Sequence, residues 1–359
     1  MPDIMISEDD LRDPAIDDVL ALHRSVQPQA AQQTADVKTP FYYNPIFYYS
    51  VASVIGGVTV WAITEPYNRE GDHGHSRGIP FVSDYLLFGP VAAALGLSIG
   101  TVYGLMNRNW KQVLYCGAVG MGVGLVVTLL TTIVADILFG ITSMIAVAFM
   151  RNQAPPAPGE FPLKGMSFVI FMSGRAIAWS VVSMGAGMGL GIALKSKKLV
   201  LNGFVGGMIG GLIGGLFFDP ISRFVLGQAS DGSVSRFVGI FAVSLFVGIF
   251  IGLFENLSKE AWFLMLKGPL TGKQFIVFKN PMLIGSSPKS DIYLFKDPDI
   301  APLHATVMKS GSKYILTDEG SGKGTFVNGK AIDKYVLQSN DVISLGEAVL
   351  KYSEKTKGA

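Results

Sequence analysis

Six segments of this chain are long and apolar enough to cross a lipid bilayer, which takes about 20 apolar residues. A mean hydropathy of +0.41 with only 16% charged residues agrees with this, because two water-soluble domains would carry more charge. Residues 41–260 are therefore predicted to form a polytopic α-helical membrane bundle of about six helices. The predicted spans are Ile46–Ile63, Tyr85–Met106, Val113–Val134, Phe168–Leu194, Leu199–Phe218 and Phe237–Leu257.

The third span leaves one question open. The apolar stretch runs on from Val113 to Met150 and is interrupted by Asp136, and its second part, Ile137–Met150, is too short to cross a bilayer alone. We expect it either to extend the third helix or to lie at the interface. The break APPAPGEFP then ends it, which leaves the status of residues 137–167 undecided.

Positive charge predicts the orientation of the spans. The loops NRNWK and KSKK follow the second and fourth helices, whereas the other loops have little excess of lysine or arginine. Lysine and arginine favour the cytoplasmic side. With six spans, the acidic, flexible tail (residues 1–40) and the carboxyl-terminal domain also lie in the cytoplasm. Without a basic segment leading into an apolar core at the start, no cleaved signal is expected. The predicted location is the plasma (inner) membrane.

An internal repeat is visible in the glycine-rich part. Residues 85–139 align with residues 168–224, which suggests two duplicated hairpins in the same orientation. In the alignment, Gly104 falls on Gly189 and, after one inserted residue, Gly117 falls on Gly203.

The fifth helix carries a stripe of glycines that favours close helix packing. The stripe consists of Gly203, Gly207, Gly211 and Gly215. It predicts a helix interface within one chain or between copies of a homo-oligomer, or alternatively a glycine-lined conduit.

Three ionisable residues in the predicted spans are candidates for a role in the membrane. Asp136, Arg175 and Asp219 are all expected near helix ends, where they would anchor or cap the helices, or alternatively form an ion pair or carry protons.

No metal or cofactor is indicated. His73 and His75 lack a third ligand nearby, and the single cysteine, Cys116, lies in an apolar run. The net charge of +2 gives no argument for nucleic acid.

From Gly268 onward the pattern changes to short strands separated by turns. Asn328-Gly329 indicates a two-residue hairpin. Residues 261–359 are therefore predicted to be an all-β sandwich. The eight expected strands are Gln274–Phe278, Met282–Ile284, Asp291–Leu294, Ala305–Lys309, Lys313–Thr317, Thr325–Val327, Asp341–Leu345 and Ala348–Tyr352.

The same stretch resembles the forkhead-associated (FHA) domain family. The resemblance rests on LIGSSPKSDIYL, PLHATV, GTFVNG and NDVISLG in this order, and it covers about the last quarter of the chain. It implies a cytoplasmic β-sandwich that binds phosphothreonine peptides through loops at one end. The residues that it places in or beside these ligand loops are Gly285, Ser286, Ser287, Lys289, His304, Lys323, Gly324, Thr325 and Asn328.

Three phosphate-reading positions differ from the family pattern. Ser286 stands in place of the arginine, Ala301 in place of the serine, and Lys323 in place of the asparagine. Phosphate binds best to a bidentate guanidinium with hydroxyl and amide donors. The loops are thus expected to bind a protein without requiring phosphate, to bind phosphothreonine peptides, or to be purely structural. Thr34 in QTADVK is a possible phosphorylated ligand in the same chain.

The sequence favours a membrane-anchored adaptor or scaffold for signalling that presents this domain to a cytosolic protein or phosphopeptide. The alternative is a transporter or channel regulated by the domain. A third hypothesis is a subunit of a larger membrane complex. No catalytic motif is present, so an enzyme is not expected.

Overall fold

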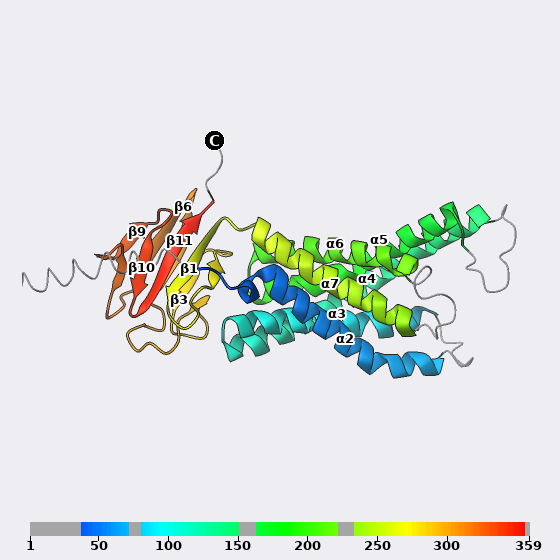
Figure 1. Ribbon diagram of the computed structural model, residues 1–359, viewed down its shortest axis with the longest axis horizontal. Coiled ribbons are helices and arrows are strands. Elements are labelled where there is room, and N and C mark those ends of the chain that lie inside the picture. The colour runs from blue at the N-terminus through cyan, green and yellow to red at the C-terminus, as the bar shows by residue number, and fades with distance from the viewer. Residues whose placement is uncertain (1–36, 72–79, 151–162, 222–232, 356–359) are drawn as a thin grey trace, which may run out of the picture.

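The computed structural model describes residues 37–71, 80–150, 163–221 and 233–355. These residues form a helical bundle and a β-sandwich that lie end to end (Figure 1). The short 3₁₀ helix η2 (Phe41–Tyr43) lies where the two parts meet.

In the part of the chain that the structure describes, six helices build the bundle, and each is long and apolar enough to span a membrane. Their apolar side chains cover most of each helix surface, as expected for helices that face lipid or other helices. The helices are α2 (Pro45–Gly71), α3 (Pro80–Met106), α4 (Trp110–Met150), α5 (Met166–Ala193), α6 (Lys197–Ile221) and α7 (Ser233–Leu257).

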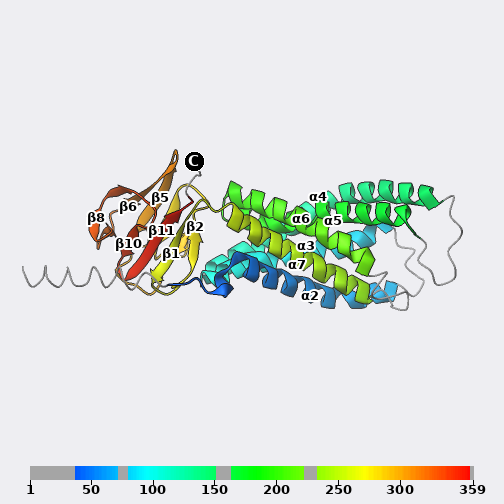
Figure 2. The same cartoon turned by 45° about the horizontal axis from the view of Figure 1, so that its top comes forward.

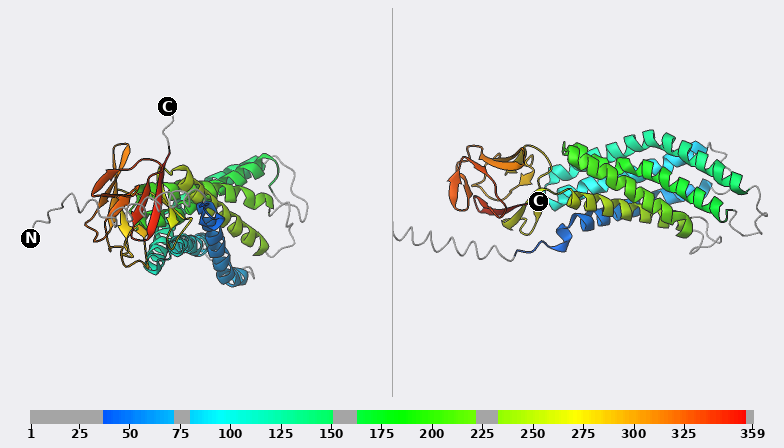
Figure 3. Two further views of the ribbon diagram at one scale, coloured as in Figure 1. Left: turned by 60° about the vertical axis from the view of Figure 1, so that its left-hand side comes forward. Right: turned by 90° about the horizontal axis from the view of Figure 1, so that it is seen from above.

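Helix α4 resolves the ambiguous third span. It continues for 41 residues without a break, which is about 60 Å at 1.5 Å per residue and about twice the hydrocarbon thickness of a bilayer. The end of α4 and the start of α5 extend beyond the other helices, away from the sandwich (Figures 1 and 3). The expected extension of the third helix is therefore confirmed, and Asp136 lies within the helix. The expectation that Asp136 lies near a helix end is wrong, because no proline interrupts the helix between Asp136 and Met150.

Glycines bring the backbones of neighbouring helices into contact. A methyl group at Gly203 of α6 would lie 2.0 Å from the carbonyl oxygen of Gly187 in α5. The same stripe continues with Gly207, Gly211 and Gly215, all against α5, while Gly206, Gly210 and Gly214 face α7. The predicted glycine stripe is thus filled by neighbouring backbones of the same chain. This leaves no open conduit along it.

The turns of the two hairpins, α3–α4 and α5–α6, have the same backbone geometry. Arg108 and Lys195 both have positive φ, at 49° and 52°. The amide of Asn109 donates to Gly104 O, and that of Ser196 donates to Gly191 O, each at 2.9 Å. This geometry pairs Gly104 with Gly191, whereas the sequence alignment paired it with Gly189. The sequence register was wrong by two residues here because glycines recur often enough to align in more than one way.

The β-sandwich consists of two sheets (Figure 2). One has the strand order β2-β1-β11-β10-β7-β8, and the other has the order β4-β3-β5-β6-β9. Their facing sides bury one core, which includes Phe263, Ile284, Leu316 and Tyr352. The strands are β1 (Ala261–Lys267), β2 (Gln274–Ile276), β3 (Met282–Gly285), β4 (Ile292–Tyr293), β5 (Ala305–Ser310), β6 (Lys313–Asp318), β7 (Thr325–Val327), β8 (Lys330–Ile332), β9 (Lys334–Val336), β10 (Val342–Leu345) and β11 (Ala348–Glu354).

Three of these strands were not expected from the sequence. β1 follows α7 after only three residues, and its run AWFLMLK has no polar residue before Lys267 to show the alternation of a strand. β8 and β9 are three-residue strands at sheet edges, and each begins with a lysine. Such short edge strands lack an apolar pattern of their own.

We predict that Gly203→Ala lowers the free energy of unfolding by about 1–3 kcal/mol, because the added methyl group separates two packed backbones. Thermal unfolding of the full chain in mild detergent measures this change. The matched control is Gly122→Ala in α4, where nothing lies within 4 Å of the added methyl group. It should be neutral or stabilising by up to about 1 kcal/mol. Equal effects of the two substitutions would contradict the packing described above.

Candidate functional site

His304 connects two of the loops at the proposed ligand-binding end of the sandwich. Its side chain is fully buried. The Nδ1 atom accepts a hydrogen bond from the amide of Ala301 at 3.2 Å, and Nε2 lies 3.3 Å from the carbonyl oxygen of Gly324. Since Nδ1 is the acceptor, Nε2 carries the proton and donates. One neutral imidazole therefore fixes the β4–β5 loop relative to the β6–β7 loop.

The β3–β4 loop is attached to the β4–β5 loop in turn. The amide of Ser286 donates to Ala301 O at 3.0 Å, and the Ser286 hydroxyl donates to Ile300 O at 2.7 Å. Gly285 is required at its position because a Cβ atom there would lie 2.3 Å from Pro302 O. The Ser286 hydroxyl thus donates its proton within the protein, and Ala301 offers no side-chain donor.

Asp318 organises the β6–β7 loop and was not singled out from the sequence. Its carboxylate accepts hydrogen bonds from the hydroxyls of Ser321 and Thr325, at 2.5 and 2.6 Å, and from the amide of Ser321. Burial raises the pKa of Asp318, but these hydrogen bonds outweigh it and the net pKa is lowered. Gly324 has a φ of 78°. An aspartate directly before the small residues of EGSGKGT is the signal that would have identified this turn.

Asn328 is placed differently from the other ligand-loop candidates. Its amide nitrogen donates to Asp341 at 2.7 Å, and its Oδ1 accepts from the amide of Val342 at 2.9 Å. With a φ of 51°, Asn328 forms the predicted hairpin turn with Gly329. The side chain is therefore used to attach this hairpin to the start of β10.

Three exposed lysines supply positive charge to the loops: Lys289, Lys323 and Lys296, which lies in the β4–β5 loop next to Asp297. The Lys323 side chain is 64% exposed, and its Nζ lies 3.7 Å from Asp299. Lys289 is exposed in the β3–β4 loop, beside the half-buried Ser287. No arginine follows Arg236 in the sequence. The domain therefore offers mobile point charges and no bidentate guanidinium of its own.

The bundle contacts the β3–β4 loop directly. The Asn109 amide group, in the α3–α4 turn, donates to Pro288 O at 2.8 Å, and the Gln112 amide group donates to Ser290 O at 3.4 Å. Arg108 and Lys111 flank these residues and are exposed. The sequence NRNWK had indicated only the orientation of the helices. The contact of this segment with the β3–β4 loop joins distant parts of the chain, so the sequence alone did not predict it.

The candidate charges of the membrane part lie elsewhere. Arg175 and Asp219 form an ion pair at 3.0 Å, and the guanidinium lies 5.0–5.2 Å from the ring centres of Phe139, Phe171 and Phe218. Arg236 and Glu65 form a second pair at 2.8 Å that the sequence did not suggest. Both pairs join helix segments remote from the hairpin turns at the sandwich. Thr34, His73 and His75 lie outside the described residues.

We predict that His304→Ala lowers the free energy of unfolding of the sandwich by about 2–4 kcal/mol, since it removes two hydrogen bonds and leaves a cavity. Hydrogen exchange of the full chain should accelerate in peptides that cover residues 299–305 and 320–325. The exposed Lys330→Ala on β8 is the control, for which no change is expected. Unaltered exchange in His304→Ala would show that the loops hold their positions without the imidazole.

The comparisons with known proteins match the region of the β-sandwich. The family model of the FHA domain matches residues 282–346. The oxoglutarate dehydrogenase inhibitor of Corynebacterium jeikeium (strain K411) is 32% identical over 106 residues, which cover 29% of this chain and 73% of that protein.

Two further proteins are similar over the same region. The glycogen accumulation regulator GarA of Mycolicibacterium smegmatis is 31% identical over 25% of this chain and 56% of its own length. The solved FHA domain of CT664 from Chlamydia trachomatis is 24% identical, with a TM-score of 0.25, and the match covers 27% of this chain and all of that one. Through residues 282–346, in its C-terminal part, this chain belongs to the FHA-domain family.

Proposed function

We propose that this chain is a membrane-anchored adaptor whose FHA domain holds a cytosolic protein at the membrane. The observation that carries the proposal is the position of the domain. It follows α7 after three residues and rests on the turns of two hairpins, at one end of six helices of membrane-spanning length. Because the domain is attached directly to the helices, it stays wherever the helical bundle is.

The chemistry of the loops favours an acidic partner segment. Lys289 and Lys323 are exposed, and Leu303 in the β4–β5 loop is 43% exposed. Arg108 in the α3–α4 turn and Lys111 at the start of α4 are exposed as well. The domain has no arginine, and the Ser286 hydroxyl donates to Ile300 O. Its loops therefore discriminate the geometry of a phosphate group less strictly than loops with a guanidinium and a free hydroxyl would. The partner is thus bound through its acidic character, and phosphorylation strengthens the binding without being required.

The location follows from the charges of the loops. The turns containing NRNWK and KSKK both contact the sandwich, so one side of the bundle carries both basic loops and the domain. By the preference of lysine and arginine, this is the cytoplasmic side of the plasma (inner) membrane, and both termini lie there. The exposed apolar end of α4, with Met144 75% exposed, would face lipid, another copy of the chain or a subunit of a larger membrane complex.

The names of the relatives support a role without catalysis. They describe an inhibitor of oxoglutarate dehydrogenase and a regulator of glycogen accumulation. By analogy, the partner of this chain is a cytosolic protein whose activity or location the adaptor controls. Neither a cofactor nor nucleic acid has a part in this function.

Regulated transport is a second candidate function. A cavity of about 190 Å³ between α3, α5, α6 and α7, lined in part by Arg175, Trp179 and Arg236, favours it. However, both arginines are engaged in ion pairs, with Asp219 and Glu65. Paired charges are more readily explained by bundle stability than by a moving substrate, so the adaptor is preferred.

We predict that partners co-purify with the full chain in mild detergent and that most of them remain after phosphatase treatment. The double substitution Lys289→Glu with Lys323→Glu should reduce their recovery by about tenfold or more, because it reverses the charge that meets the acidic segment. The matched control is Lys313→Glu, an exposed position at the start of β6, remote from the β6–β7 loop. Complete loss of all partners with phosphatase would establish strict phosphate reading, and equal recovery with both variants would contradict binding by the loops.

A further inference from the structure

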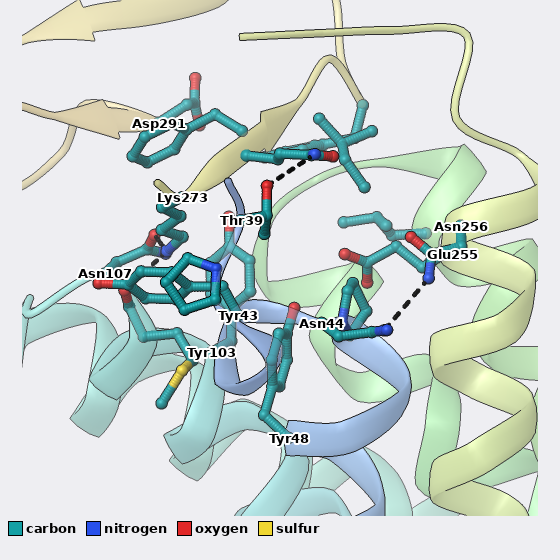
Figure 4. A pocket seen from close by; sticks show the side chains of 18 of the residues that line it. Thr39, Tyr43, Asn44, Tyr48, Tyr103, Asn107, Glu255, Asn256, Lys273 and Asp291 are labelled. Carbon is teal, nitrogen blue, oxygen red and sulfur yellow. Dashed lines mark hydrogen bonds between the residues drawn. The ribbon is translucent and has the colours of Figure 1, made fainter. Parts of the chain in front are cut away.

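A cavity of about 310 Å³ lies between the bundle and the sandwich. Its walls come from the segment Thr39–Pro45, from the ends of α3 and α7 that face the sandwich, and from β2 with its neighbouring loops (Figure 4). This volume is at the lower end of the range for small-molecule sites, about 300 to 1,000 Å³. The FHA ligand loops described above are not part of these walls, apart from Asp291 at the end of the β3–β4 loop.

Lys273 brings a buried positive group to one side of the cavity. It follows Gly272, whose φ of 84° turns the chain between β1 and β2. Its side chain is 8% exposed, and Nζ donates to Met106 O at 2.7 Å and to Asn107 Oδ1. Burial lowers the pKa of Lys273 to about 7, although the charge of Glu255 partly offsets this. An ammonium group has three N–H donors, and two of them have protein acceptors here.

Glu255 brings a buried carboxylate to the opposite side. It is 8% exposed, and its Oε2 accepts from the Tyr49 hydroxyl at 2.9 Å. Glu255 lies in the last turn of α7, where the helix dipole disfavours a negative charge. The Tyr48 hydroxyl also interacts with this carboxylate, and the charge of Lys273 attracts it across the cavity. Neither burial nor the helix position stabilises the negative charge of Glu255. A positive group in the cavity would stabilise it.

The Lys273 ammonium and the Glu255 carboxylate face each other across the cavity. Figure 4 shows Lys273 and Glu255 on opposite sides of the cavity, with Tyr48 between them. Among the described residues they form no ion pair with each other. The rings of Tyr43, Tyr48 and Tyr103 also line the space. Tyrosine rings attract ammonium groups.

We infer that this cavity binds a small zwitterion, whose anionic group contacts Lys273 and whose ammonium group contacts Glu255 and the tyrosine rings. Lys273 and Glu255 compensate each other only in part across the cavity, and a ligand with a single charge would add a close partner for only one of them. The zwitterion is either a free amino acid or the headgroup of phosphatidylethanolamine. Because its two ends contact different halves of the protein, bound ligand stabilises their docking.

Calorimetric titration of the full chain in phosphatidylcholine nanodiscs tests this inference. The probes are glycine, β-alanine, γ-aminobutyrate, δ-aminovalerate and phosphoethanolamine. We expect saturable binding at one site, tightest for the chain length that matches the gap between the two charges. Acetate and ethylammonium should each bind at least tenfold more weakly, since each replaces only one interaction. This comparison requires no variant.

Substitutions then locate the site. Lys273→Met and Glu255→Gln should each weaken binding by about tenfold or more, as expected for loss of a hydrogen bond to a charged group, whereas Lys313→Met should leave it unchanged. Weaker binding in phosphatidylethanolamine nanodiscs would identify the headgroup as the occupant, and equal binding would identify a free amino acid. Absence of binding for every probe in both lipids, or binding that neither substitution alters, would overturn the inference.

Discussion

The hydrogen-bonded junction between bundle and sandwich is the constraint on which the other features depend. Only Ser258–Glu260 separate α7 from β1, so the sandwich has no flexible linker. Asn109 and Ser196, which occupy equivalent positions of two hairpin turns, each donate to a backbone carbonyl of the sandwich, at 2.8 and 2.7 Å. Glu260 adds contacts with Lys309 of β5 and Lys198 of α6, and the hydrogen bonds from these two lysines lower its pKa to about 2. These last pairs are exposed and therefore contribute little to stability.

This junction connects two regions of potential function. On one side, Asn109 holds the β3–β4 loop, which takes part in the network around His304. On the other side, the neighbouring Asn107 accepts from Lys273 at the edge of the interdomain cavity. A ligand in the cavity and a partner bound to the loops would therefore both affect the turn from Asn107 to Asn109. The proposed adaptor would sense conditions at the membrane through the element that also positions its binding loops.

The sequence allowed most of the architecture to be predicted, because its signals are local. Apolar length identified the helices, and the pattern around His304 and Asn328-Gly329 identified the FHA domain. The full length of α4 was left open because Asp136, a charged residue in an apolar run, has the same local appearance as a helix end. The register of the two hairpins depended on the turns at Arg108 and Lys195. Both residues have positive φ although neither is a glycine, so the sequence did not mark the positions of these turns.

The candidate site was predictable only in part. Gly285, His304 and Gly324 lie around three connected loops. That these loops bind a ligand stays a prediction of the family resemblance. The contact of Asn109 with Pro288 and the opposition of Lys273 and Glu255 involve residues far apart in sequence. No local pattern specifies such contacts. They arise only when the last helix leads directly into the first strand.

A disulfide test in native membranes examines the docked junction most directly. With the buried Cys116 replaced by alanine, cysteines at positions 109 and 288 should cross-link upon mild oxidation, because the Asn109 side chain contacts Pro288. A control pair at positions 109 and 326 should remain reduced, since Phe326 lies on β7, in the other sheet from the β3–β4 loop. Cross-linking of the first pair alone is the predicted result. Equal cross-linking of both pairs, or of neither, would show that the sandwich is not fixed to the bundle and would contradict the account.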